Sequence, residues 1–195
     1  MDALGQLQHL LRIDRDAWRA YSQAIDNADE EDLREMLTGF RADHERHIAD
    51  LSAAIAAMGG TPAKLAHMAG FALARITGVA AGMNSTGALM AIQSNEVVTN
   101  QAYELALQTP LTAELRELLE RNLADERRHL AALRERLEGH SVAGHMLSGS
   151  ATLQGLGTSL WMNVIRTNPV ATALAATGAA VLLGGYFLGH RRKAG

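Results

Sequence analysis

Apolar residues recur at steps of three and four along two long segments of the chain, a spacing typical of amphipathic helices. The inward positions of the first segment are Leu33, Leu37, Phe40, His44, His47, Leu51, Ile55 and Met58. Those of the second segment are Leu115, Leu119, Asn122, Glu126, His129, Leu133 and Leu137. A shorter segment with similar spacing precedes each of them, at residues 7–25 and 89–107. The pattern therefore predicts four helices.

The chain also contains an internal repeat, because a shift of 82 positions aligns residues 7–55 with residues 89–137 without a gap. Identical pairs include Leu7/Leu89, Tyr21/Tyr103, Asp43/Asp125, Arg46/Arg128 and His47/His129. Each half has a short turn between its helices and so predicts an antiparallel hairpin. Two hairpins in one chain predict an all-α four-helix bundle over residues 1–138. Its parts are hairpins 3–58 and 84–138, joined by a long crossover at 59–83.

Six ionisable side chains occupy inward positions of these helices, where apolar residues are expected. They are Asp14, His44, His47, Glu96, Glu126 and His129. Burying such groups unpaired costs several kcal/mol each, so they must pair with one another or with a cation. Asp14 lies 33 residues before His47, and Glu96 lies 33 residues before His129, which places these groups at equivalent levels. We expect all six to converge at the midpoint of the bundle.

This combination of residue types predicts a metal site. Carboxylates can bridge two hard cations and neutralise their charge, and imidazole supplies a nitrogen ligand suited to iron. In di-iron and di-manganese bundles, two helices each contribute a carboxylate and the other two each contribute Glu-x-x-His. The six residues therefore predict one or two ions of iron or manganese. The alternative is a salt-bridge network in the same fold, formed by Asp14, His44, His47 and Glu126.

Residues 3–138 resemble the ferritin-like superfamily, which includes rubrerythrin, bacterioferritin and the manganese catalases. The motif Glu126-x-x-His129, together with Glu96 and Tyr103, carries the resemblance. It implies a ferritin-like antiparallel four-helix bundle with a di-metal carboxylate centre. The ligand positions that it implies are Glu96, Glu126 and His129, followed by His47 and Asp14.

His44 departs from the pattern of this superfamily, which has a glutamate there as the second bridging carboxylate. A neutral imidazole has one free lone pair and cannot bridge two ions. Asp14 in place of a glutamate also shortens one arm by a methylene. The sequence therefore argues against a symmetric dinuclear centre. The alternatives are a lopsided pair of ions, a single ion, or a site that has lost its metal.

Tyr21 and Tyr103 lie two turns from Asp14 and Glu96 on the same helix faces. Their hydroxyls can hydrogen-bond the ligands or relay electrons. Alternatively, each ring fills the core and pairs its hydroxyl with a neighbour. The spacing supports both interpretations equally.

The crossover is apolar and rich in glycine and alanine over residues 65–83. Residues 69–103 are similar to the crossover and third helix of demethoxyubiquinone hydroxylases, membrane-associated di-iron enzymes of the same superfamily. Those enzymes have a full set of glutamates, from which His44 departs, so the quinone substrate is not carried over. We expect the crossover to pack against neighbouring helices, with contact to a membrane surface as the alternative.

The C-terminal region predicts a membrane anchor. Residues 170–188 carry no charge, and a helix of that length spans about 28 Å, close to the thickness of the bilayer core. Asn168 and Pro169 suit a helix start, and three basic residues follow the apolar run. We expect a linker at 139–167 and a transmembrane helix at 168–190, with a buried C-terminal helix as the alternative. The run also resembles the anchor of tail-anchored, ribosome-associated inner-membrane proteins of enterobacteria.

Charge and composition narrow the function. The chain lacks cysteine, which excludes disulfides, zinc–thiolate sites and thiol catalysis. All 21 acidic residues lie within residues 1–138, which carry a net charge of −7, and this argues against nucleic-acid binding. No secretory signal is evident, so we expect the bundle in the cytoplasm at the inner membrane. A homo-oligomer is one option for its assembly.

These observations lead to two functional hypotheses. The first is a membrane-tethered ferritin-like metal-binding protein, whose iron or manganese reacts with dioxygen or peroxide in oxidative stress or metal handling. One form of this hypothesis is a di-metal oxidoreductase. The second is a non-catalytic, tail-anchored helical bundle that has lost the metal and serves as a binding or stress module.

Overall fold

Helices make up almost all of residues 2–64, 85–139 and 142–167, the part of the chain that the computed structural model describes. They are α1 (Ala3–Asp26), α2 (Glu31–Ala57), α4 (Ser85–Leu107), α5 (Ala113–Glu138) and α6 (Val142–Thr167). The prediction of an all-α bundle is confirmed. Most of the crossover and the predicted transmembrane helix at 168–190 lie outside the described residues. Within them, no helix combines the length and apolar character needed to cross a membrane.

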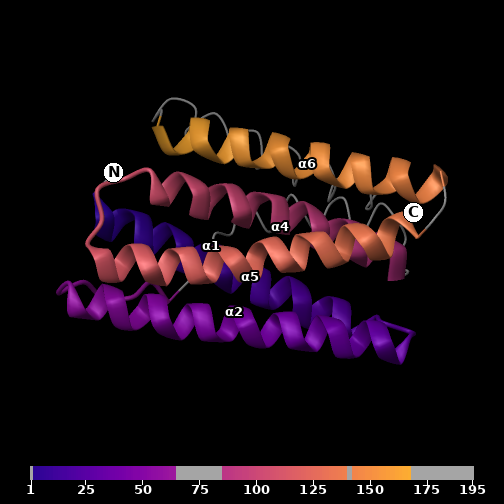
Figure 1. Ribbon diagram of the computed structural model, residues 1–195, viewed down its shortest axis with the longest axis horizontal. Coiled ribbons are helices and arrows are strands. Elements are labelled where there is room, and N and C mark those ends of the chain that lie inside the picture. The colour runs from indigo at the N-terminus through magenta and orange to yellow at the C-terminus, as the bar shows by residue number, and fades with distance from the viewer. Residues whose placement is uncertain (1, 65–84, 140–141, 168–195) are drawn as a thin grey trace, which may run out of the picture. The chain divides into compact units, whose positions relative to one another are not determined.

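The chain divides into two compact units, Met1–Thr158 and Ser159–Gly195, and all packing described below lies in the first. There, α1 lies beside α2, α4 lies beside α5, and α1 also packs against α4 (Figure 1). Local signals set several helix ends. The side chains of Asp2 and Thr112 accept hydrogen bonds from the first turns of α1 and α5. Gly139 ends α5 with φ +40°, a left-handed conformation that glycine adopts without strain.

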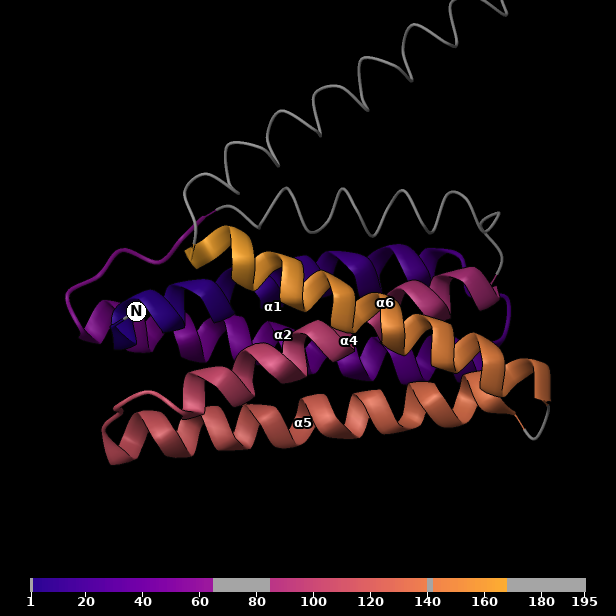
Figure 2. The same ribbon diagram turned by 90° about the horizontal axis from the view of Figure 1, so that it is seen from above.

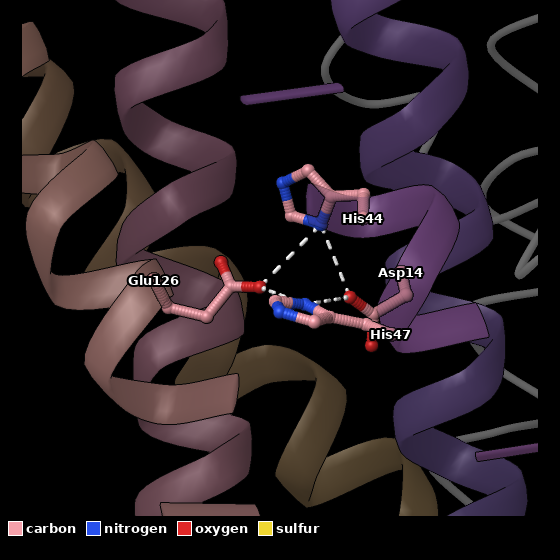
Figure 3. A group of neighbouring side chains, drawn as sticks. All are labelled: Asp14, His44, His47 and Glu126. Atoms are coloured by element: carbon pink, nitrogen blue, oxygen red, sulfur yellow. Dashed lines mark hydrogen bonds and ion pairs between the residues drawn. The ribbon is translucent and has the colours of Figure 1, made fainter. Parts of the chain in front are cut away.

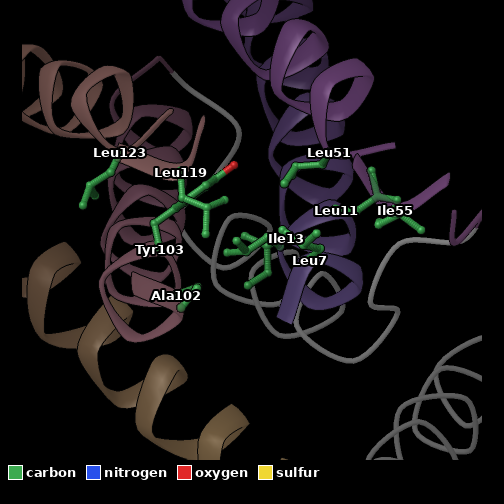
Figure 4. Close-up of a cluster of buried hydrophobic side chains, with 11 residues drawn as sticks. Leu7, Leu11, Ile13, Leu51, Ile55, Ala102, Tyr103, Leu119 and Leu123 are labelled. Atoms are coloured by element: carbon green, nitrogen blue, oxygen red, sulfur yellow. The ribbon is translucent and has the colours of Figure 1, made fainter. Parts of the chain in front are cut away.

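Two clusters of buried hydrophobic side chains, each with one tyrosine among aliphatic residues, fill the bundle. The first contains Leu7, Leu10, Leu11, Ile13, Leu51, Ile55, Ala102, Tyr103, Ala106, Leu119 and Leu123 (Figure 4). The second contains Tyr21, Ala24, Ala28, Leu33, Leu37, Leu89, Ile92, Leu133 and Leu137. On each of the four helices, the inward polar residues lie between members of one cluster and members of the other. The clusters therefore flank the polar centre along the bundle.

Helix α6 occupies most of the segment that the sequence predicts as a linker, at 139–167. Up to Thr158 it lies against α4 (Figure 2), where the Gln93 amide donates to the backbone oxygen of Ser148 at 2.9 Å. The Ser94 hydroxyl donates to the backbone oxygen of Ala151 at 2.8 Å. Glycine and serine are abundant in this segment and have low helix propensity, so the sequence did not predict a helix. Tertiary contacts with α4 supply the stabilisation that local propensity lacks.

Substitution of Gly155 tests this contact, because a Cβ atom added at this glycine would lie only 2.5 Å from the Ser94 backbone oxygen. We expect Gly155→Ala to weaken the packing of α6 by about 1–3 kcal/mol, the usual cost of overpacking. Gly157→Ala is the matched control, since its Cβ meets nothing within 4 Å. It is expected to stabilise the helix by up to about 1 kcal/mol. Thermal unfolding and limited proteolysis of α6 provide the measurement, and equal behaviour of the two variants would contradict the close contact.

Candidate metal centre

All six ionisable residues singled out in the sequence are fully buried and lie together. Helix α1 supplies Asp14, α2 supplies His44 and His47, α4 supplies Glu96, and α5 supplies Glu126 and His129. They form two overlapping groups in which one potential ligand atom of each residue lies within 4.8 Å of the others. One group is Asp14, His44, His47 and Glu126 (Figure 3). The other is His44, Glu96, Glu126 and His129.

In the first group, neighbouring side chains satisfy Asp14. Asp14 Oδ1 lies 3.0 Å from His44 Nδ1 and 3.2 Å from His47 Nδ1. The Tyr103 hydroxyl donates to the second oxygen of Asp14 at 2.7 Å. His47 Nδ1 also lies 3.0 Å from Glu126 Oε1. Every side-chain oxygen of Asp14 therefore has a hydrogen-bond partner.

His44 lies between three carboxylates. Its Nδ1 is 3.0 Å from Asp14 Oδ1 and 3.4 Å from Glu126 Oε1, and its Nε2 is 3.2 Å from Glu96 Oε1. Both ring nitrogens thus face carboxylate oxygens. An ionised carboxylate accepts hydrogen bonds and cannot donate them. An imidazole that donates from both nitrogens carries a positive charge.

The second group contains three buried atoms without a hydrogen-bond partner: Glu96 Oε2, Glu126 Oε2 and His129 Nδ1. His129 Nδ1 lies 3.8 Å from Glu96 Oε2 and 4.0 Å from Glu126 Oε2. Such separations are too long for hydrogen bonds. The two carboxylate oxygens and the imidazole nitrogen therefore face a common region without bonding to one another. Because unpaired buried polar atoms are costly, this part of the centre is suited to a cation.

Two of the histidines each contact a further carboxylate through the ring nitrogen that faces away from the centre. Asp125 Oδ2 is 3.3 Å from His47 Nε2, and Asp43 Oδ2 is 3.0 Å from His129 Nε2. These contacts leave both Nδ1 atoms directed inward. In metal sites, an outer carboxylate of this kind orients the histidine ligand and raises its basicity.

Two arginines complete this outer layer. Arg46 pairs with Asp43 at 2.6 Å and with Asp125 at 2.5 Å. Arg128 pairs with the same two aspartates, at 2.5 and 2.8 Å. In the sequence, these four residues stand out only as matches within the repeat, and no role was predicted for them. The available signal was the motif Asp-x-x-Arg-His, present in both halves of the repeat.

Both tyrosine hydroxyls bind carboxylates of the centre, since Tyr21 donates to Glu96 Oε1 at 2.7 Å just as Tyr103 does to Asp14. Asn100 was not predicted, and its amide donates to the backbone oxygen of Glu126 at 3.0 Å, which ties α4 to α5. The Phe40 ring stacks on His129 with centroids 4.2 Å apart. These contacts hold the ligand-bearing side chains in place.

Contacts among these side chains shift their pKa values strongly. Burial by itself raises the pKa of Asp14, but hydrogen bonds with His44 and His47 outweigh it and lower this pKa to about 2. Burial also acts against ionisation of Glu96, yet His44 and the charge of His129 lower its pKa to about 2. Burial lowers the pKa of His47, but hydrogen bonds with Asp14 and Glu126 raise it to about 10.

The remaining ligand candidates shift in other directions. Burial and repulsion from Glu96 raise the pKa of Glu126 well above its usual range, despite attraction from His44. Burial also lowers the pKa of His129. For His44, attraction from the carboxylates around it overcomes burial and raises the pKa. These shifts favour the cationic forms of His44 and His47, the ionised forms of Asp14 and Glu96, and the uncharged form of Glu126.

Fold and site together define an all-α bundle with buried carboxylate–histidine groups that could hold a metal ion. Residues 2–109 match a family described as a domain of unknown function (DUF2383). The match covers more than half of the chain, and the protein belongs to this family. Its matched part includes Asp14, His44, His47 and Glu96, whereas α5 lies beyond its end. Neither the curated proteins nor the solved structures contain a match to the chain.

Proposed function

We propose that the protein is a membrane-tethered, ferritin-like metal-binding protein that holds one or two ions of iron or manganese. The observation that carries this proposal is the set of three buried, partnerless atoms: Glu96 Oε2, Glu126 Oε2 and His129 Nδ1. Two carboxylate oxygens and one imidazole nitrogen directed at one region form a donor set for a divalent cation. The site fits such an ion, because an ion would supply the partner that the protein does not.

The donor types support the choice of metal. Carboxylate oxygens suit manganese, imidazole suits iron, and the chain offers no thiolate that would select a softer ion. Likeness to the ferritin-like superfamily in Glu126-x-x-His129 supports the same two metals. Bound iron or manganese supplies the redox chemistry for reaction with dioxygen or peroxide. The chain positions the ligands, and the aliphatic clusters on both sides limit access of water.

The membrane tether is proposed from the apolar run at 168–190 alone. In this proposal the run anchors the bundle to the inner membrane, with the bundle in the cytoplasm. Fractionation of cells that express the full chain tests it. We expect the chain in the membrane fraction, resistant to high salt and released by detergent, and a variant ending at residue 167 in the soluble fraction.

Metal analysis of the full chain tests the central proposal. The protein is purified in mild detergent, without a histidine tag and without chelator. We expect one to two equivalents of iron or manganese, lost in the Glu126→Ala and His129→Ala variants. Zero equivalents in the wild-type protein, even after anaerobic loading with ferrous iron, would overturn the proposal.

A second function has one observation in its favour. His44 contacts carboxylates through both ring nitrogens, so the imidazole can take the place of a cation among them. This arrangement suits a non-catalytic bundle that keeps the polar network for stability and acts as a binding or stress module. Metal content separates the two functions.

A further inference from the structure

The internal repeat divides the candidate centre into two halves that can be compared position by position. Under the shift of 82, residues of like chemistry correspond. The corresponding pairs are Asp14 and Glu96, His47 and His129, Tyr21 and Tyr103, and Asp43 and Asp125. The exception within the centre is His44, which corresponds to Glu126. One half of the centre thus has an imidazole where the other half has a carboxylate.

The two halves also differ in how their atoms are satisfied. In the half with His44, both oxygens of Asp14 and both ring nitrogens of His47 have partners within 3.3 Å. In the other half, His129 Nδ1 has no partner, and Glu96 Oε2 and Glu126 Oε2 have none when Glu126 is ionised, as it would be on a metal ion. The ligand atoms that a cation could engage without breaking a hydrogen bond are therefore confined to one half.

We infer that the centre binds a single metal ion, held by Glu96, Glu126 and His129, and that the His44 ring lies where a second ion would be held. This inference rests on the proposed function and specifies its stoichiometry. The ring contacts one oxygen each of Asp14, Glu126 and Glu96, at 3.0, 3.4 and 3.2 Å. These are the three acidic groups that two ions would have to share, so the ring takes the place of one cation.

Anaerobic titration of the full-length protein with ferrous iron, and separately with Mn²⁺, tests the inference. We expect one equivalent in the wild-type protein. His44→Glu makes the two halves alike, with Glu-x-x-His on both α2 and α5, and we expect it to bind two equivalents. One equivalent in a folded His44→Glu variant would overturn the role assigned to His44.

The outer aspartates provide a matched pair of variants that does not depend on His44. Asp43 lies behind His129 in the half assigned to the ion, and Asp125 lies behind His47 in the other half. We expect Asp43→Asn to weaken binding about 10- to 100-fold, as loss of an outer carboxylate does elsewhere. We expect Asp125→Asn to change the affinity much less, although both aspartates pair with the same two arginines.

The outcomes separate this inference from the proposed function. Two equivalents in the wild-type protein would overturn the single-ion assignment and leave metal binding intact. Equal weakening by Asp43→Asn and Asp125→Asn would overturn the assignment to one half. Zero equivalents in the wild-type protein would overturn the proposed function and the inference with it.

Discussion

Replacing Glu126 with glutamine is expected to remove metal binding and leave the helical bundle folded. One oxygen of Glu126 lies 3.0 Å from His47 Nδ1, and the other is buried without a partner beside His129. Glutamine keeps the shape of the side chain but cannot acquire the negative charge that a divalent cation requires. Metal content after anaerobic loading is expected to fall from one or more equivalents to zero.

The fold is expected to survive because burial and Glu96 raise the pKa of Glu126 and so favour the uncharged form of this side chain. An amide imitates that state closely, and the free energy of unfolding without metal should change by less than about 2 kcal/mol, within the range for one buried hydrogen bond. Circular dichroism and urea unfolding measure it. Exposed Glu117→Gln on the same helix is the control. A glutamine variant that still binds metal stoichiometrically would remove Glu126 from the ligand set.

The metal-free protein is expected to lose stability as the pH rises above 6.5. The pKa of His47 is raised from 6.5 to about 10, so the native state keeps a proton that the unfolded state releases. The stabilisation is fully present below pH 6.5 and is lost as the pH approaches 10. Each retained proton contributes a slope of about 1.4 kcal/mol per pH unit. The raised pKa values of His44 and Glu126 act in the same direction.

Urea unfolding at pH 6.5, 7.5 and 8.5 in the presence of chelator measures this slope. His47→Gln is expected to reduce it by about one proton, because glutamine does not titrate. With metal bound, the part of the slope due to Glu126 should disappear, because ligation requires its proton to leave and the affinity for the metal therefore rises with pH. Stability that is independent of pH between 6.5 and 8.5 would contradict the charged network.

Much of the bundle could be predicted from the sequence because its signals are local or repeated. Apolar spacing around Leu33 and Leu37 marks one face of a helix whatever lies across from it. The shift of 82 then indicates that the second half of the chain repeats the hairpin of the first. The metal roles of the six inward residues stay a prediction that metal analysis must test.

Helix α6 shows the opposite case. Its glycines and serines are poor helix formers. The close approach of Gly155 to Ser94 and the hydrogen bonds from Gln93 and Ser94 hold this segment on α4. Such a fit depends on two surfaces far apart in the sequence. The spacing of residues within one segment carries no information about it.

Residue order is enough to predict the all-α class, the duplicated hairpin and the six ionisable residues on inward faces, because helical periodicity and internal homology are properties of residue order. How those residues share their contacts depends on the packing of the helices against one another. That packing placed Asp43 and Asp125 behind the two histidines, surrounded His44 with three carboxylates and left Glu96 Oε2 without a partner. Distances between side chains on different helices settle these points, and no spacing along a single helix encodes them.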